Sequence, residues 1–179
     1  MIGVSHKTGC PVALDQLRLL TLDHWGFDGE VHVGRLVVHE DQAAALVRTF
    51  ATIFRARYPI ARMQLVDASH ADDDRSMDDD NSSAFNCRPK TGQSTGFSEH
   101  SYGRAIDLNP VRDPYLTSCG SVFPPAGAAY AKRSSPEGRE PGTIHADDAV
   151  VRAFADIGWK WGGSSSGARD YQHFSRSGM

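Results

Sequence analysis

Two clusters of polar side chains, more than 60 residues apart, constrain this chain more than any other feature of its sequence. The first, residues 98–107, reads SEHSYGRAID, and the second, residues 170–174, reads DYQHF. His100 and Asp107 are seven residues apart, so on one regular strand their side chains would point to opposite faces. Gly103 supplies a residue that is free to bend between them. The fold must therefore turn near Gly103 and bring the C-terminal cluster to the same place.

The side chains of the two clusters suit a catalytic zinc site. Imidazole nitrogens and carboxylate oxygens bind zinc at ~2.0–2.2 Å, and a catalytic zinc takes three protein ligands and keeps one open position. His100, Asp107 and His173 would supply the three ligands. Asp170, three residues before His173, would act as general base on water whose pKa zinc lowers from ~15.7 to ~7. Either spacing alone is weak evidence for a metal site, because a lone histidine is usually structural. The prediction depends on the two clusters occurring in one chain.

Composition and charge narrow the class of protein. The 179 residues suit one domain, 1–179, and 40% apolar with 23% charged residues is ordinary for a globular protein. A net charge of -3 argues against a general nucleic-acid binder. No apolar run approaches the ~20 residues of a membrane helix, and no export signal segment is visible.

The hydrophobic pattern predicts an α+β fold with few helices and an antiparallel sheet. A β-branched run predicts a strand at 31–38, and residues 62–67 predict a second. Helices are predicted at 41–57 and 147–158, and a short final strand at 170–174. The buried face of the first helix is expected to consist of Leu46, Val47, Phe50, Ile53 and Phe54.

The other segments are predicted to be irregular. Residues 109–141 are expected to wrap around the domain with at most short elements. Residues 68–97 form a long irregular section, in which the acidic run 72–80 is expected to be a solvated loop, with a loose calcium site as the alternative. Residues 1–30 are also expected to be irregular, with five leucines as core contacts: Leu14, Leu17, Leu19, Leu20 and Leu22.

The histidines and cysteines outside the two clusters are given no metal role. His32 and His39 lie on or beside the strand predicted at 31–38 and are expected to be sheet residues. The three cysteines lack the close C-x-x-C pairing of a structural zinc site. They are compatible with one disulfide and one free thiol, or with three reduced thiols.

The first cluster matches the S-x-H-x-x-G-x-A-x-D signature of the D-alanyl-D-alanine metallopeptidases, the group of the VanX- and VanY-type peptidases and the phage L-alanyl-D-glutamate endolysins. The end of the chain, from Ile157-Gly158-Trp159 to the second cluster, resembles the DY-x-HF ending of the carboxypeptidase-like branch. Residues 83–89 and 124–127 also resemble members of that branch. Where the branch leads us to expect D-W after the Gly-Gly pair, this chain has Ser164-Ser165, a change that bears on substrate binding rather than on the metal ligands.

The resemblance implies a fold and a set of site residues. The fold would be the α+β fold shared with the Hedgehog signalling domain, a small antiparallel sheet with flanking helices and long loops. Zinc would be held by His100, Asp107 and His173, with Asp170 as catalytic base where other branches use glutamate. For two further residues, two roles each are considered. Arg88 would grip the substrate carbonyl or carboxylate or pair with the acidic run, and Ser98 would bind substrate or brace the loop that carries His100.

The implied activity is zinc-dependent hydrolysis of peptidoglycan stem peptides, at a D-Ala–D-Ala or an L-Ala–D-Glu bond. The alternative is a non-catalytic, metal-stabilised binding module of the Hedgehog-type fold. A phage-type lytic enzyme is a third interpretation, which differs from the first in its biological setting more than in its chemistry. The protein is expected to be a monomer that is secreted or associated with the cell wall. The resemblance also implies a Cys10–Cys87 disulfide with Cys119 free, which suits an exported protein.

Overall fold

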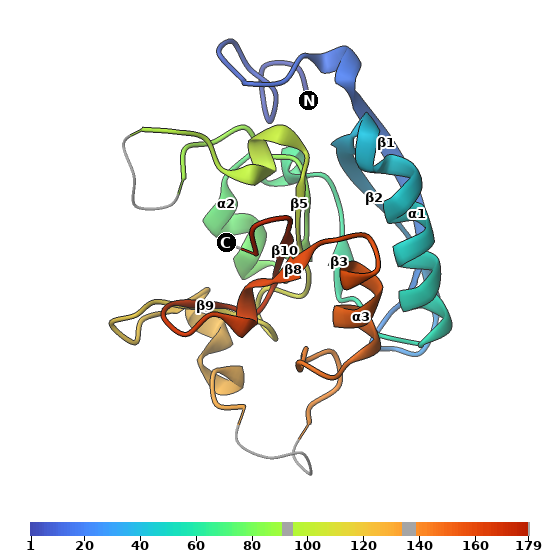
Figure 1. Cartoon of the computed structure of the whole chain (residues 1–179), viewed down its shortest axis with the longest axis vertical. Helices are drawn as coiled ribbons and strands as arrows, with labels where there is room; N and C mark the ends of the chain where they lie inside the picture. Colours follow the sequence, from blue (N-terminus) through green and yellow to red (C-terminus); the bar gives the residue numbers. More distant parts are fainter. Residues whose placement is uncertain (91–94, 134–138, 179) are drawn as a thin grey trace.

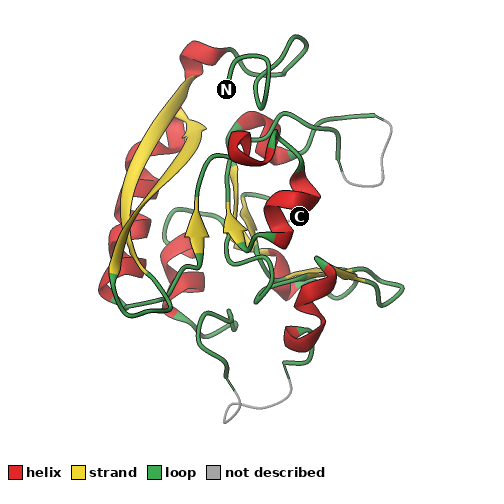
Figure 2. Ribbon diagram, turned by 180° about the vertical axis from the view of Figure 1, so that it is seen from behind, coloured by secondary structure: helices red, strands yellow, loops and turns green. Residues whose placement is uncertain are grey.

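The computed structural model describes residues 1–90, 95–133 and 139–178. A long two-stranded hairpin and the helix α1 (Glu40–Arg55) form one side of the molecule, and a group of short strands lies beside them (Figures 1 and 2). No helix in the described ranges is long and apolar enough to cross a membrane.

The hairpin consists of β1 (Leu17–Trp25) and β2 (Val31–His39), paired antiparallel along their full length. The predicted strand at 31–38 is confirmed, whereas the expectation that residues 1–30 are irregular is wrong. Because alternate side chains of a strand face opposite sides, the leucines of β1 divide between core and solvent. Leu17, Leu20 and Leu22 are buried, but Leu19 is 56% exposed, and Leu14, in the 3-10 turn η1 (Leu14–Gln16), is 39% exposed. The predicted core role of these last two residues is therefore wrong.

Helix α1 confirms the first predicted helix and packs against β1. Its buried apolar face includes Leu46, Phe50 and Ile53, whereas Val47 is 45% exposed, against the prediction. His39 ends β2 and caps the helix, because its ring accepts a hydrogen bond from the Asp41 main-chain N–H. This buried histidine therefore has a structural role, and His32 is exposed and paired with Asp28.

The centre of the molecule is a three-stranded antiparallel sheet with the order β5-β10-β8. Its strands are β5 (Ala105–Asp107), β8 (Lys160–Trp161) and β10 (His173–Ser175). The second predicted helix appears as α3 (Ala149–Ala155). It fixes the sheet through Phe154, whose ring stacks on that of Phe174 with 4.1 Å between the centroids. Both rings are fully buried, so this contact is part of the main hydrophobic core.

The described part of the section 68–97, which leaves out residues 91–94, is more regular than its sequence suggests. It contains part of the 3-10 turn η2 (Val66–Ser69), the helix α2 (Asp73–Asp78) and β4 (Asn81–Ser82), which pairs in parallel with β3 (Arg62–Met63). The acidic run is thus largely helical and not a loop, because the Asp72 carboxylate accepts the Arg75 main-chain N–H and caps α2. The strand predicted at 62–67 shortens to the two residues of β3 because the 3-10 turn replaces its second half.

The segment 109–141 wraps around the domain with short elements, as predicted, although residues 134–138 lie outside the described ranges. It carries β6 (Tyr115–Leu116), β7 (Val122–Phe123) and the 3-10 turn η4 (Pro125–Tyr130). A second three-stranded sheet, β7-β6-β9, joins it to β9 (Arg169–Asp170). The final strand predicted at 170–174 is therefore divided between two sheets. The described chain forms several small sheets, including the parallel pair β3–β4, where one antiparallel sheet was expected.

A buried carboxylate fastens the wrapping segment to the core. Asp113 is fully buried and accepts hydrogen bonds from the Ile144 main-chain N–H at 2.8 Å, the Tyr58 hydroxyl at 3.2 Å and the Arg133 guanidinium at 2.6 Å. Burial raises the pKa of Asp113 to about 7, although the Arg133 charge and these hydrogen bonds lower it.

This pKa predicts a loss of stability as the pH rises from about 4 to about 7. An unfolded aspartate has a pKa of ~3.9, so within that window folded Asp113 keeps a proton that the unfolded chain has lost. Stability falls with pH wherever the folded state binds more protons, here by on the order of 4 kcal/mol at most. Urea unfolding at several pH values should show this fall in the wild type and a smaller one in Asp113→Asn. Identical pH profiles would contradict it.

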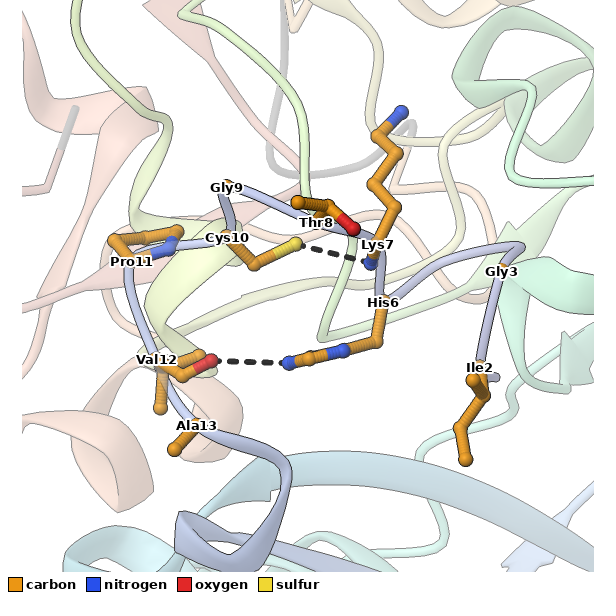
Figure 3. Close-up of a pocket in the computed structure, with 10 residues that line it drawn as sticks. All are labelled: Ile2, Gly3, His6, Lys7, Thr8, Gly9, Cys10, Pro11, Val12 and Ala13. Carbon is orange, nitrogen blue, oxygen red and sulfur yellow. Dashed lines mark hydrogen bonds between the residues drawn. The ribbon is translucent and has the colours of Figure 1, made fainter.

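The N-terminal arm is tied to the core by a Cys10–Cys87 disulfide, and Cys119 is exposed and free, as the family resemblance implied. Residues 2–3 and 6–13 of this arm line an open hollow of about 580 Å³ (Figure 3). The bond links positions 77 residues apart. Cys87 itself is buried.

Loss of this disulfide is expected to lower the free energy of unfolding by about 4 kcal/mol, since closing a loop of this length restricts the unfolded chain by that order. The measurement is urea unfolding of a Cys10→Ser/Cys87→Ser double variant. Cys119→Ser is the matched control and should unfold like the wild type. A double variant as stable as that control would contradict the expectation.

Candidate metal centre

The turn predicted near Gly103 places the first metal-ligand candidate. His100 lies in the 3-10 turn η3 (Glu99–Tyr102), before β5, so the odd spacing from Asp107 no longer puts the two side chains on opposite faces of one strand. Ser98 caps the turn, and its Oγ accepts the His100 main-chain N–H at 3.4 Å. Gly103 ends the turn with φ +65°, and a Cβ there would lie 2.5 Å from the main-chain nitrogen of His39. Glycine is required at this position both by conformation and by space.

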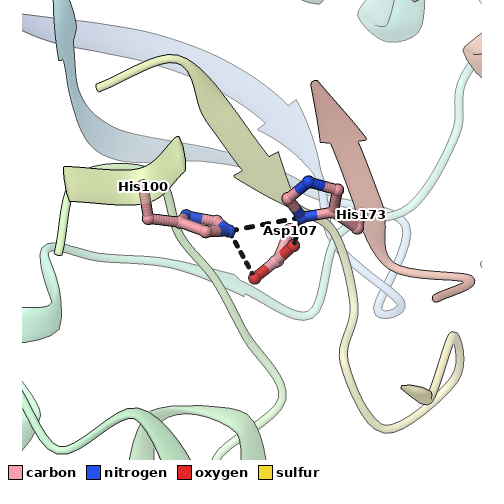
Figure 4. A group of neighbouring side chains, drawn as sticks. All are labelled: His100, Asp107 and His173. Atoms are coloured by element: carbon pink, nitrogen blue, oxygen red, sulfur yellow. Dashed lines mark hydrogen bonds and ion pairs between the residues drawn. The ribbon is translucent and has the colours of Figure 1, made fainter. Parts of the chain in front are cut away.

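Pairing of the strands places the other two candidates. Asp107 on β5 lies opposite His173 on β10, and His173 Nδ1 is 2.9 Å from Asp107 Oδ1. His100 Nε2 lies 3.1 Å from Asp107 Oδ2 and 3.3 Å from His173 Nδ1 (Figure 4). All three side chains are buried. The structure therefore brings together the three residues that the sequence predicted as ligands of one metal ion, called the metal group below.

Hydrogen bonding and charge orient this group. His100 Nδ1 is 2.5 Å from the Ala84 carbonyl oxygen, which fixes Nδ1 as the donor and leaves the lone pair of Nε2 facing the group. Burial favours a raised pKa for Asp107, but the charges and hydrogen bonds of the two histidines hold that pKa well below its usual range. Burial lowers the pKa of His173, yet the hydrogen bond and charge of Asp107 raise it overall.

The geometry of the group fits a tetrahedral metal ion. Two atoms bound to one zinc at ~2.0–2.1 Å lie roughly 3.3 Å apart, close to the 3.1 and 3.3 Å that separate His100 Nε2 from its two neighbours. Two imidazoles and one carboxylate are also a donor set that suits zinc. Among the described residues, this is the group of histidine, cysteine and acidic side chains that could hold a metal, and the acidic run 72–80 does not form one.

Asp170 approaches the group from the second sheet. It lies on β9, three residues before the start of β10, and its Oδ1 is buried with no hydrogen-bond partner in the described chain. Burial raises the pKa of Asp170 to about 7, assisted by the Asp107 charge and opposed by those of His173, His100 and Arg88. Gly162 permits this placement, because a Cβ there would lie 2.6 Å from the Asp170 carbonyl oxygen. An unpartnered buried carboxylate oxygen is costly, so it marks a place for a donor such as water.

Arg88 borders the group and also pairs with the acidic run. Its Nη2 lies 2.9 Å from Asp73 Oδ2 on α2, while its charge lowers the pKa of Asp170. The pairing of Arg88 with the acidic run is therefore observed, and its contact with substrate stays a prediction. No side-chain pattern marks the Ala84 carbonyl, which is a main-chain group, and nothing in the sequence distinguishes Asp73 from its acidic neighbours. Ser164 is exposed at the end of η6 (Gly162–Ser164), and Ser165 is half-buried.

No curated protein and no solved structure matches this chain, so the expected relationship to the Hedgehog fold stays a prediction. Residues 91–176 match the family model described as D-alanyl-D-alanine carboxypeptidase. This range contains the buried His100–Asp107–His173 group and Asp170, and it confirms the resemblance indicated by the motifs. Over these residues, just under half of the chain, the protein is similar to the D-alanyl-D-alanine carboxypeptidase family.

Proposed function

We propose that the protein is a zinc-dependent peptidase that hydrolyses peptide bonds in peptidoglycan stem peptides. The observation that carries this proposal is the buried His100–Asp107–His173 group, together with Asp170, whose buried Oδ1 has no hydrogen-bond partner in the described chain. These three residues would hold the metal. When bound, zinc supplies Lewis-acid chemistry: it polarises a carbonyl and makes water more acidic.

The chain itself would supply proton transfer and charge stabilisation. Asp170 would take a proton from the attacking water, whose oxygen bonds to the scissile carbonyl carbon. As the C–N bond breaks, the same carboxyl would return the proton to the leaving amine. The Arg88 guanidinium would stabilise negative charge on the substrate carbonyl or carboxylate. Ser98 would act indirectly, because its hydroxyl already caps the turn that carries His100.

A non-catalytic, metal-stabilised binding module is the second candidate. Such a site needs ligands but has no use for a nearby buried carboxylate with an oxygen that lacks a hydrogen-bond partner. The position of Asp170 therefore favours the enzyme. The Cys10–Cys87 disulfide supports action in an oxidising compartment, as expected of an enzyme that works on the cell wall.

Digestion of purified peptidoglycan tests the proposal. Zinc-loaded protein is expected to release fragments detectable by mass spectrometry, and chelator-treated protein is expected to release none. A mass loss of a single terminal residue would identify a carboxypeptidase, and larger fragments an endopeptidase cutting at L-Ala–D-Glu. An inert protein with zinc bound at full occupancy would reject the peptidase proposal and favour the binding module.

A further inference from the structure

A row of three side chains crosses the second sheet and ends at Asp170 on β9, which is labelled in Figure 1. In the register of this sheet Asp170 lies opposite Tyr115 of β6, and Tyr115 lies opposite Phe123 of β7. Residues that lie directly opposite each other in an antiparallel sheet point their side chains to the same face. Tyr115 and Phe123 therefore lie on the same face of this sheet as the Asp170 carboxylate.

The pairing of β6 with β9 brings Tyr115 close to Asp170. The Tyr171 main-chain N–H donates to the Pro114 carbonyl oxygen at 3.4 Å, so Pro114 and Tyr171 form a hydrogen-bonded pair. Because hydrogen-bonded and non-hydrogen-bonded pairs alternate along an antiparallel ladder, Tyr115 and Asp170 form a non-hydrogen-bonded pair. Side chains lie closer together in a pair of this kind. The first ring of the row is thus adjacent to the proposed proton-transfer residue.

The two rings form one apolar surface, called the aromatic platform below. The rings of Tyr115 and Phe123 are stacked, with 6.4 Å between their centroids and 27° between their planes. Phe123 is 41% exposed, and Tyr115 is half-buried. Residues 115–123, which form β6, β7 and the turn between them, contain no charged side chain. Arg169 points to the other face of β9, because successive side chains of a strand alternate.

We propose that the aromatic platform is a substrate subsite, which binds an alkyl side chain two or three residues from the scissile bond. Neighbouring strands lie ~4.8 Å apart, so Phe123 is two strands, or ~10 Å, from the backbone of Asp170. An extended peptide advances ~3.3 Å per residue, so a peptide whose scissile carbonyl lies beside Asp170 reaches Phe123 with its third residue.

The chemistry of the platform selects the group that it binds. Burial of alkyl carbon against the two rings is favourable, whereas a charged group would lose water there without gaining a partner of opposite charge. This inference rests on the proposed function and deepens it. It assigns peptides that carry a long alkyl stem at the second or third residue as the preferred substrates.

The test compares Phe123→Ala with two control variants, all loaded with zinc. Phe123→Tyr keeps an aromatic ring, and Leu19→Ala removes an exposed apolar side chain from β1, on another sheet. The probes are stem-peptide analogues with norleucine or glycine at the second or third residue on either side of the scissile bond. In the wild type, norleucine at one of these positions is expected to raise kcat/KM about tenfold over glycine, mainly through KM.

Phe123→Ala should lose most of this preference and cleave the glycine peptide as the wild type does. Phe123→Tyr and Leu19→Ala should both keep the preference. Equal cleavage of the glycine peptide also shows that the Phe123→Ala protein is folded, so a changed preference is a change in binding.

A second measurement does not depend on turnover. In zinc-loaded Asp170→Asn protein, the norleucine methyl signal is expected to move upfield in NMR spectra on binding, because the methyl group lies over the faces of the two rings. The shift should be smaller when Phe123→Ala is added. An equal shift in both proteins would overturn the contact.

The possible failures can be told apart. If the wild type cleaves both peptides without a preference, or if Phe123→Ala keeps the preference, the subsite is overturned while the proposed function stands. If the wild type with zinc bound cleaves neither analogue and releases nothing from peptidoglycan, the proposed function falls and the subsite falls with it. A dimer in sedimentation that Phe123→Ala dissociates would assign the platform to a second copy of the chain and overturn its role in substrate binding.

Discussion

Replacing His100 with alanine is expected to weaken zinc binding by more than about 100-fold. The change removes one of three buried ligand side chains, and loss of a group that merely orients a ligand already costs ~10–100-fold in affinity. It also leaves the Ala84 carbonyl oxygen without its 2.5 Å contact. Zinc affinity is measured by competition with a chromophoric chelator, with circular dichroism to confirm that the variant is folded.

His32→Ala is the matched control, because His32 is exposed and pairs with Asp28 at the end of the hairpin. Its zinc affinity should equal that of the wild type. If His100→Ala bound zinc as tightly as this control, the assignment of His100, Asp107 and His173 as ligands would be rejected, whatever activity the protein shows.

Replacing Asp170 with asparagine is expected to lower kcat by about 10²–10⁴-fold, the usual contribution of a positioned acid–base group. Asparagine keeps the size of the side chain but cannot accept and return a proton. Zinc affinity should change little, because Asp170 is not one of the three side chains that form the group. Steady-state hydrolysis of a stem-peptide analogue, together with the chelator competition, separates the two effects.

Asp156→Asn serves as the control for this change, since Asp156 is exposed at the end of α3. A variant of Asp170 that retained the wild-type kcat would remove Asp170 from the mechanism. A parallel loss of zinc affinity and kcat would instead make Asp170 part of the metal site.

The metal group could be predicted from the sequence because its ligands are side chains, whose identity the sequence gives directly. The signal consists of a histidine and an aspartate around a glycine, with a second histidine far along the chain. When such side chains are buried, a shared metal ion is one of the few partners that can satisfy all of them. The strand at 31–38 and the helix that became α1 were equally accessible, since each is marked by a clear period of apolar residues.

Other features depend on contacts that sequence reasoning does not see. The β1 strand was missed because its leucines are not β-branched and occur on both faces, so pairing with β2 decides its conformation. The α2 helix was missed because a run of aspartates has poor helix propensity, and capping by Asp72 and pairing of Asp73 with Arg88 offset that preference. The Ala84 carbonyl has no side-chain signal at all.

The C-terminal cluster, residues 170–174, is divided between two sheets, and this division affects which properties of the protein a substitution can change. Asp107 and His173 share the β5-β10-β8 sheet, whereas Asp170 on β9 pairs with Tyr115 of β6. Only Tyr171 and Gln172 separate the two strands. We therefore expect insertions or substitutions in the wrapping segment to shift Asp170, the proposed proton-transfer residue, relative to His100, Asp107 and His173. Changes at residues 115–130 should then alter turnover more than metal affinity.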